Sequence, residues 1–377
     1  MSKKGAFYEF LNPDEVYVPL DDDVDLLITN EQYVYKEQKL GIKAHKIITS
    51  PVSGVVRGAK NASLLQGSKQ KCIVIANDFK EKVAKKTGLK KFPKTMSGEE
   101  LTILLQSKNI NLDLLKSDTL LISGIDLEES SLTSSYILRD NMAYILETID
   151  YLRDTLNIST TLLVLDNSDT DNISKVSEFL GSYPEISLRL INGQYPAGIE
   201  MVLKSQLELD SKAIFLRFND VLAIYNALIR SKSFSEVYIT ICGSILEEPV
   251  VVNVKIGSLV SAIINQFVKL KTTEPVFFLN FSAGHYEVDI SDLIVTKDLA
   301  TIIIQEKEEI EEGECLNCGL CYKACPFGIN PKYIKDNINN EKKLARSKVN
   351  QCLKCGVCSI LCPANIDLKK YLKGDII

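Results

Sequence analysis

The sequence predicts a multidomain chain of mixed α/β and α+β class, with a small β domain in front and a cysteine-rich region at the end. Three observations predict this class. Short apolar runs broken by turn residues fill the first part, strand-like and helix-like segments alternate in the middle, and eight of the ten cysteines stand near the C-terminus. With 377 residues, of which 45% are hydrophobic, the chain can bury several cores without disulfides.

The charge and the N-terminal segment narrow the class of protein. A net charge of −5 and a pI near 5.4 argue against a nucleic-acid-binding protein. The segment "MSKKGAFYEF" lacks the apolar core of a signal peptide, and no apolar run reaches the roughly 20 residues that cross a bilayer. We therefore expect a cytoplasmic protein, in which closely spaced cysteines serve as metal or redox ligands more often than as disulfides.

Residues 1–75 predict a β domain of the barrel-sandwich type. The segments "EVYVPL", "YVYKEQKLG" and "SPVSGVV" each join a strand-like run to turn residues, and no helical period interrupts them. Pro51 and Gly54 flank a tight turn between two strands. The pattern suggests a lipoyl-like or biotinyl-like fold. No lysine stands at a hairpin tip with the residues that flank a carrier lysine, so we interpret the domain as a scaffold.

Residues 76–235 predict a Rossmann-like parallel α/β domain. The runs "DTLLISGID", "TTLLVLDN" and "ISLRLIN" are strand-like, and segments with helical spacing follow each of them. Such alternation indicates a parallel sheet with helices on both faces. Ligand sites in these sheets lie at the carboxyl ends of the strands. The residues at those ends are Gly124 with Asp126, Asp166 with Asn167, and Asn192 with Gly193. Polar residues after strands are also ordinary helix caps and turns, and position alone favours this second use by about three to one.

Residues 236–305 predict a compact α+β module, read as strand, strand, helix, strand and strand along the chain. The acidic segment "EKEEIEEGE" then forms an exposed junction to the last region. Two cysteines lie in apolar β-like runs upstream of this junction, Cys72 and Cys242. Because free cysteine is usually buried, we expect both to be structural thiols.

Residues 306–377 contain two copies of the pattern C-x2-C-x2-C-x3-C-P. In this spacing three thiolates bind one iron–sulfur cubane, and the fourth, redirected by the proline, reaches the other cluster. The spacing predicts two [4Fe–4S] clusters, one held by Cys315, Cys318, Cys321 and Cys362 and the other by Cys352, Cys355, Cys358 and Cys325. Gly319 and Gly356 follow the second cysteine of each run, where a small residue lets backbone amides approach the cluster sulfurs.

Two other uses of the cysteines fit less well. Structural zinc takes two pairs of ligands across a longer loop and often includes histidine, whereas His45 and His285 stand far from both runs. A disulfide framework does not suit a reducing compartment. Between the runs, Tyr333, Ile334 and Leu344 lie at helical spacing, so we expect a helical insert.

The order of these modules resembles the C subunit of the Rnf electron transport complex, which is related to the flavoprotein subunit of respiratory complex I. The motifs that carry the resemblance are "VYKEQKLG", "SPVSGVV", "DTLLISGIDLEESSLTS", "YPAGIEMVL", "PVVVNVKIGSLVSAII" and the cysteine-rich tail. The resemblance covers nearly the whole chain. It implies a soluble-ligand-binding β-grasp fold for residues 236–305 and a two-cluster ferredoxin fold for residues 306–377.

The same resemblance implies a flavin and NADH site, and the sequence departs from the family there. The family's glycine-dense loop G-x-G-G-A-x-F-P-T corresponds to "TGLKKFPKT", which puts Leu89, Lys90 and Lys91 where small residues are expected. The family's E-C-E-P segment becomes Asp126 to Glu129, without cysteine or proline. The positions that remain of this altered site are Gly88, Gly124, Asp126, Glu128, Gly198 and Glu200.

We therefore expect an iron–sulfur electron-transfer subunit of an Rnf-like redox complex, with a decayed or altered flavin site. Its partners would be other subunits, some of them membrane-embedded, and it would lie on the inner face of the cell membrane through them. Four lysines near the cysteines are expected to be exposed, either as solvated charges or to steer a ferredoxin or flavodoxin: Lys323, Lys332, Lys354 and Lys369. Two alternatives stay open, an FMN-containing NADH dehydrogenase with an adapted site and an adaptor subunit with structural clusters.

Overall fold

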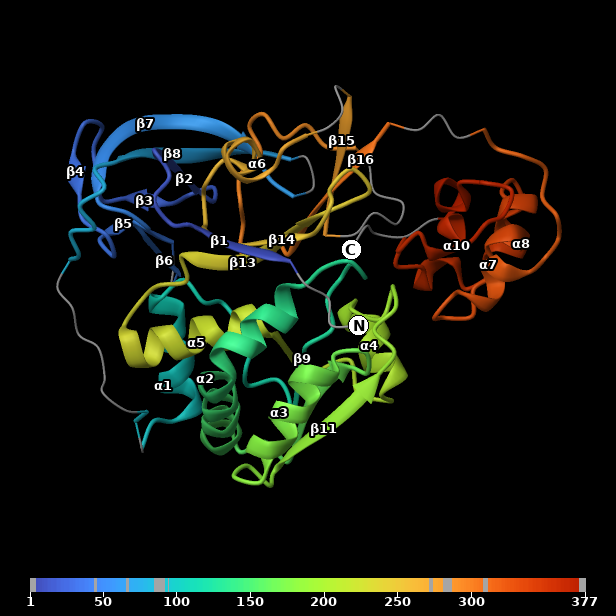
Figure 1. Ribbon diagram of the computed structural model, residues 1–377, viewed down its shortest axis with the longest axis horizontal. Coiled ribbons are helices and arrows are strands. Elements are labelled where there is room, and N and C mark those ends of the chain that lie inside the picture. Colours follow the sequence, from blue (N-terminus) through green and yellow to red (C-terminus); the bar gives the residue numbers. More distant parts are fainter. Residues whose placement is uncertain are drawn as a thin grey trace.

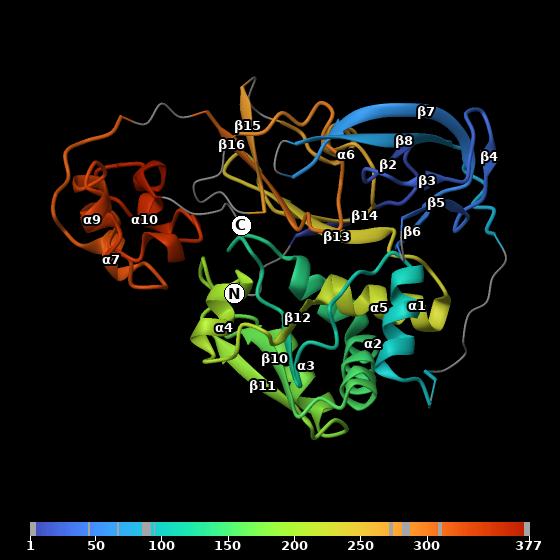
Figure 2. The same ribbon diagram turned by 180° about the vertical axis from the view of Figure 1, so that it is seen from behind.

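The computed structural model describes residues 5–43, 46–65, 68–84, 92–93, 95–270, 274–280, 287–307 and 311–372. Figure 1 shows a barrel-sandwich region and a five-stranded sheet side by side, a parallel α/β sheet below them, and the cysteine-rich region at one end. In the view from behind, the cysteine-rich region again stands apart from the barrel sandwich (Figure 2). None of the helices in the described stretches is long and apolar enough to span a membrane.

The barrel-sandwich region contains two small sheets that close over an apolar core of Val16, Val34, Leu40 and Ile75, among others. The four-stranded sheet has the order β2 (Glu15–Pro19), β8 (Lys69–Asn77), β7 (Gly54–Ser63) and β4 (Tyr33–Val34). The three-stranded sheet has the order β3 (Asp25–Leu26), β5 (Lys39–Lys43) and β6 (Lys46–Thr49). A Cβ atom at Gly54 would lie 1.9 Å from the Ala76 carbonyl oxygen, so only glycine allows β7 to approach β8 here.

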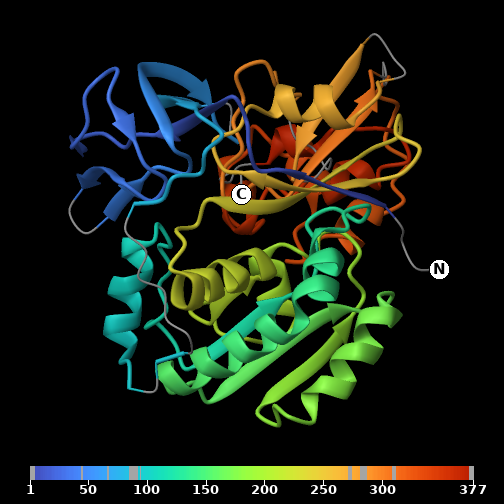
Figure 3. The ribbon, with the colours of Figure 1, turned by 60° about the vertical axis from the view of Figure 1, so that its left-hand side comes forward.

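The five-stranded sheet contains the predicted strands of residues 236–305 and one strand from the other end of the chain. Its order is β1 (Ala6–Phe10), β14 (Val250–Lys255), β13 (Glu236–Cys242), β16 (Thr301–Glu306) and β15 (Pro275–Leu279). Helix α6 (Val260–Phe267) follows β14, which confirms the predicted order of strand, strand, helix, strand and strand. Strand β1 pairs with β14 in parallel, and Figure 3 shows the N-terminal segment running alongside this sheet.

The segment before β16 differs from its prediction. The run "DLIVTKDLATIII" is expected as one strand, but regular pairing covers only β16. Leu293 and Ile294 instead make isolated bridges to Ser63 and Leu259. The Ser63 hydroxyl also donates to Asp292 at 2.7 Å. The apolar side chains of this stretch therefore join the five-stranded sheet to the barrel sandwich.

The α/β region is a four-stranded sheet in which every described pairing is parallel. Its order is β11 (Ile186–Ile191), β10 (Thr160–Asp166), β9 (Thr119–Ser123) and β12 (Ile214–Arg217). Along the chain this is third, second, first and fourth, which matches the first four strands of the doubly wound order 3-2-1-4-5-6. The helices are α1 (Gly98–Ser107), α2 (Thr133–Leu156), α3 (Thr170–Leu180), α4 (Glu200–Gln206) and α5 (Phe218–Arg230).

Alternate residues of the parallel strands face opposite layers of helices, as period 2 requires. Leu163 and Leu165 of β10 belong to the large core under α1, α2 and α5. Leu162 and Val164 of the same strand belong to a second core with Leu203 of α4. Helices therefore cover both faces of the sheet, as the alternating sequence predicts. This buried architecture fixes the carboxyl ends of the strands at one edge.

The cysteine-rich region is built from short helices around its own apolar core of Ile329, Ile334, Leu344, Val349 and Ile366. Its elements are α7 (Leu320–Lys323), α8 (Pro331–Asp336), α9 (Glu341–Leu344), η1 (Val349–Gln351), α10 (Val357–Ile360) and η2 (Leu368–Tyr371). The predicted helical insert is present as two short helices, α8 and α9. Asn330 and Asn340 cap them by accepting from Tyr333 N and Lys343 N.

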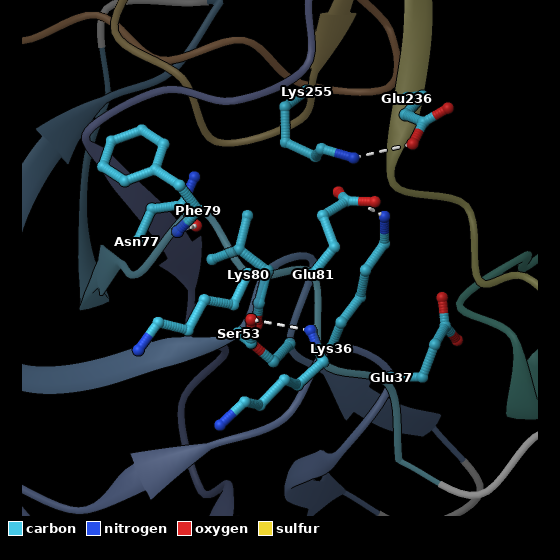
Figure 4. A network of polar contacts seen from close by, with 12 residues as sticks. Lys36, Glu37, Ser53, Asn77, Phe79, Lys80, Glu81, Glu236 and Lys255 are labelled. Carbon is cyan, nitrogen blue, oxygen red and sulfur yellow. Dashed lines mark hydrogen bonds and ion pairs between the residues drawn. The ribbon is translucent and has the colours of Figure 1, made fainter.

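A network of charged side chains lies where the barrel sandwich meets the five-stranded sheet and the α/β region (Figure 4). Lys36 Nζ lies 2.8 Å from Glu81 Oε1, and Lys255 Nζ lies 2.6 Å from Glu236 Oε1. The close-up shows these four side chains gathered at one junction. Beside them, Glu37 accepts a hydrogen bond from Ser233 N at 3.0 Å. The Lys255–Glu236 pair joins neighbouring strands of the five-stranded sheet, and the Lys36–Glu81 pair lies within the barrel-sandwich part. The hydrogen bond between Glu37 and Ser233 crosses from the barrel sandwich to the segment before β13.

Candidate cysteine centres and the pocket at the sheet edge

Four of the cysteines in the tail line one cavity of about 250 Å³. They are Cys315, Cys318 and Cys321 of the first run and Cys362 of the second run. Cys321 lies in α7, which begins after Gly319, and Gly319 adopts a φ of 75°. This left-handed backbone turns the chain between the second and third cysteines, a conformation that favours glycine. Cys315 and Cys318 are exposed, so this cavity opens toward solvent.

The other four cysteines line a second cavity, and again three come from one run and one from the other. They are Cys352, Cys355 and Cys358 with Cys325. Ile329 N donates to Cys325 Sγ at 3.4 Å, and Lys354 N donates to Cys352 Sγ at 3.3 Å. Amide hydrogen bonds to cysteine sulfur are a means by which proteins tune bound iron–sulfur clusters. Gly356 repeats the left-handed turn of the first run, with a φ of 76°.

The chemistry of both cavities fits iron–sulfur clusters. Each gathers four thiols with mainly apolar neighbours, the donor set that [4Fe–4S] clusters use. The second cavity is narrower, about 20 Å³, so its side chains must move apart to admit a cubane. The structure thus brings together the same two groups of four that the spacing predicts as ligand sets, and their ligation stays a prediction.

Burial controls the charge of the second group of thiols. It raises the pKa of Cys355 to about 11 and the pKa of Cys358 to about 12. At pH 7 these side chains are therefore neutral thiols when no cation is bound. A bound metal deprotonates a coordinating thiol, which replaces the cost of burying a free thiolate with a metal–sulfur bond.

The predicted lysines near the cysteines are less exposed than expected. Lys323 is exposed, but Lys332, Lys354 and Lys369 are half-buried. Lys332 Nζ pairs with Asp336, and burial lowers the pKa of Lys369. Lys332 lies in α8 and Lys369 in η2, and sequence spacing alone does not reveal how these short elements pack.

A separate pocket of about 220 Å³ lies at the carboxyl edge of the parallel sheet. Its lining includes Gly124, Asp126, Asp166 and Gly193 from the ends of the strands, as parallel topology requires. Six of the lining residues are acidic: Asp126, Glu128, Glu129, Asp166, Asp169 and Asp171. Two are basic, Arg139 and Lys175. The described lining of this pocket is therefore mainly acidic.

The glycines of this edge serve the packing of the chain itself. A Cβ atom at Gly124 would lie 2.6 Å from Leu165 Cδ2 and 2.9 Å from Phe218 Cε2. A Cβ atom at Gly198 would lie 2.1 Å from the backbone oxygen of Asp126. The space next to both glycines is therefore filled by protein atoms.

The polar residues predicted for the altered flavin site also have local partners. Asp126 accepts hydrogen bonds from Ser134 N at 3.1 Å and from Ser134 Oγ at 2.7 Å, where α2 begins. Glu200 lies 2.6 Å from Lys204 Nζ, one helical turn along α4. Glu128 lines the pocket, and Gly88 lies outside the described residues. Helix capping and an i,i+4 pair thus account for Asp126 and Glu200.

The two cysteines outside the tail are buried. Cys72 lies in β8 and Cys242 in β13, and their burial agrees with the prediction of structural thiols.

One tyrosine from the α/β region contacts the second cysteine group. Tyr195 precedes α4 and donates a hydrogen bond from its hydroxyl to the backbone oxygen of Cys355. Burial raises the pKa of Tyr195, so the hydroxyl keeps its proton. Sequence reasoning did not find this contact, although it singled out the motif "YPAGIE" in which Tyr195 lies.

Comparisons with known proteins agree with the two ends of this architecture. Residues 1–80 match the family described as the RnfC barrel sandwich hybrid domain, and residues 314–366 match the 4Fe-4S dicluster domain. The first match confirms the predicted N-terminal barrel sandwich. Together they define an iron–sulfur protein in which a barrel sandwich and a ferredoxin domain stand at opposite ends of one chain.

The similar whole proteins point the same way, and the chain is RnfC-like. It is 20% identical over 360 residues to the C subunit of the ion-translocating oxidoreductase complex of Vibrio cholerae, covering 86% of this chain and 46% of that protein. The protein of the same name from Pectobacterium atrosepticum is 24% identical over 231 residues, covering 58% of this chain and 33% of that protein. The chain thus spans less than half the length of these relatives.

Among solved structures, one match is the NAD+-reducing [NiFe]-hydrogenase in its air-oxidized state. It superposes with a TM-score of 0.43 at 10% sequence identity, over 70% of this chain and 59% of that chain. The H2-reduced state gives a TM-score of 0.44, also at 10% identity, over 74% of this chain and 64% of that chain.

Proposed function

We propose that this chain is an iron–sulfur electron-transfer subunit of an Rnf-like redox complex. The observation that carries the proposal is the division of eight cysteines into two groups of four, each lining its own cavity within the stretch that matches a 4Fe-4S dicluster domain. When bound, a [4Fe–4S] cluster exchanges one electron at a time. The protein supplies thiol ligands, amide donors to sulfur and an apolar shell that limits the access of water.

The two cysteine groups differ in exposure, which supports a relay with an outer and an inner end. Cys315 and Cys318 are exposed, whereas Cys358 is buried and Cys355 lies against the α/β region. We assign the exposed end to exchange with another protein, because electron transfer between proteins requires close approach to the centre. A small carrier such as ferredoxin or flavodoxin, or another subunit of the complex, is the proposed partner at this end.

We further propose that the chain works without FMN. The acidic pocket at the sheet edge and the filled space next to Gly124 and Gly198 support this.

Association of the chain with the membrane would come through other subunits. This fits the description of the relatives as part of an ion-translocating complex.

Anaerobic purification followed by iron, sulfide and flavin quantification tests the proposal. We expect iron and sulfide in equal amounts, no flavin, and a visible spectrum that dithionite bleaches and NADH does not. Bound FMN with rapid bleaching by NADH would favour an NADH dehydrogenase instead. Clusters that never exchange electrons with a partner complex would favour an adaptor subunit with structural clusters.

A further inference from the structure

The cysteine-rich region touches the α/β region at a small apolar contact next to the second cysteine group. Leu127, Ile199 and Val202 of the α/β region form its buried part. Phe327, Leu353 and Cys355 pack on them from the cysteine-rich side. The contact therefore involves the residues that flank the second group of thiols, while the exposed Cys315 and Cys318 lie elsewhere.

One polar interaction is built into this apolar contact. The Tyr195 hydroxyl donates to the carbonyl oxygen of Cys355, which joins residues of two different regions. That carbonyl belongs to the peptide that leads from Cys355 into Gly356, the left-handed residue that directly precedes α10. A hydrogen bond at this point restrains the backbone of a cysteine in the middle of its run. Because its surroundings are apolar, leaving the carbonyl without a partner there is costly.

The loop that carries Tyr195 is itself held firmly on the sheet edge. Gly198 lies so close to the Asp126 carbonyl that no side chain fits between them. Ile199 N donates to the Pro196 oxygen at 3.0 Å, and the Ile199 side chain is buried in the contact. The motif "YPAGIE" therefore has a physical role in this chain: glycine closes the loop onto the sheet edge, and the loop presents tyrosine to Cys355.

We propose that Tyr195 is a positioning residue for the second cysteine group, and that its hydroxyl fixes the Cys355 backbone against the α/β region. The proposal rests on the proposed function, because the group is taken to hold a cluster. It explains why the weak motif before α4 lies beside the cysteines. It also predicts that loss of the Tyr195 hydroxyl affects the second cysteine group and leaves the first unchanged, because the hydroxyl bonds to Cys355 and Tyr195 does not line the cavity of Cys315, Cys318, Cys321 and Cys362.

The test compares the full-length protein with its Tyr195→Phe variant, which keeps the ring and removes only the hydroxyl. Tyr183→Phe is the matched control, because Tyr183 is a half-buried tyrosine of the same region that lies outside both cysteine cavities. Redox titration followed by EPR should show a changed midpoint potential for one of two clusters in Tyr195→Phe. The other cluster, the iron content and the control variant should match the wild type.

Hydrogen exchange gives a second readout that does not depend on activity. Loss of one net hydrogen bond, about 1 kcal/mol, should speed exchange of the amides of residues 355–358 roughly fivefold. Unchanged potentials and unchanged exchange in Tyr195→Phe, with iron bound, would overturn the positioning role and leave the proposed function intact. A wild type that binds no iron would overturn the proposed function, and exchange at residues 355–358 would then judge the contact by itself.

Discussion

Replacing Lys255 by methionine should weaken the pairing of β13 with β14 in the five-stranded sheet, because Lys255 and Glu236 stand opposite each other on these strands. The Lys255 side chain is fully buried, and its ammonium group lies 2.6 Å from Glu236 Oε1. Methionine keeps a similar length and removes the charge, so the Glu236 carboxylate loses its ion-pair partner, and Lys232 and Lys36 remain as the other cations that act on it. Removing one partner of a buried ion pair typically costs about 3–5 kcal/mol.

The expected cost lies at the lower end of that range. The Glu236 side chain is 24% exposed, so water reaches the carboxylate and compensates for part of the lost attraction. We therefore expect a loss of about 3 kcal/mol in the free energy of local opening. Hydrogen exchange of the β13 and β14 amides measures it, because this readout does not require the whole chain to unfold in one step. The loss corresponds to roughly hundredfold faster exchange.

A double variant separates the ion pair from simple packing. Lys255→Met with Glu236→Leu replaces both charges by apolar side chains, and it should recover most of the loss because no charge is left buried without its partner. Exchange rates within twofold of the wild type in Lys255→Met alone would refute the reasoning. A double variant as unstable as the single variant would refute it as well, because the loss would then come from packing.

Three further predictions concern pH, ligation and one helix start. Burial opposes the charge on Glu236, but Lys255, together with Lys232 and Lys36, outweighs it and holds the pKa of this carboxyl below its usual 4.5. Stability that is present above pH 4.5 should therefore fall as acid protonates Glu236, and the fall should be weaker in Lys255→Met; hydrogen exchange measured against pH tests this. Cys325→Ser should disturb the EPR signal of the cluster assigned to the second run and leave the other signal, whereas loss of the first signal alone would contradict crossed ligation. Ser97→Ala should cost α1 about 1 kcal/mol, because Ser97 and Glu100 form a capping box, and exchange of the α1 amides reports it.

Local spacing predicted those parts of the molecule whose geometry is set by near neighbours. The two cysteine runs are short and have the same spacing, in which the fourth cysteine of one run faces the other run. Spacing alone therefore predicted that Cys325 lies with the cysteines of the second run. The alternation in β10 predicted helices on both faces of a parallel sheet, and the cores around Leu162 and Leu163 confirm it. Parallel strands then bring Gly124, Asp166 and their neighbours to one edge without further information.

Other parts of the fold depend on contacts between distant segments, which periodicity does not encode. Strand β1 pairs with β14 across most of the chain, and nothing in "AFYEF" specifies that partner. The contact between Tyr195 and Cys355 likewise joins separate regions. Helices α1 and α5 were not predicted, although each carries a local signal. Helix α1 has its capping box, and α5 has buried residues at helical spacing in Phe218, Val221 and Leu222.

The most direct test of the central claim is the metal and flavin content of the full-length protein, purified without oxygen. Two [4Fe–4S] clusters require about eight iron and eight sulfide per chain. We predict these amounts with no flavin, together with a spectrum that NADH leaves unchanged and dithionite bleaches. A sample that contains zinc in place of iron would contradict the cluster assignment, and a sample with stoichiometric FMN that NADH reduces would contradict a relay without flavin.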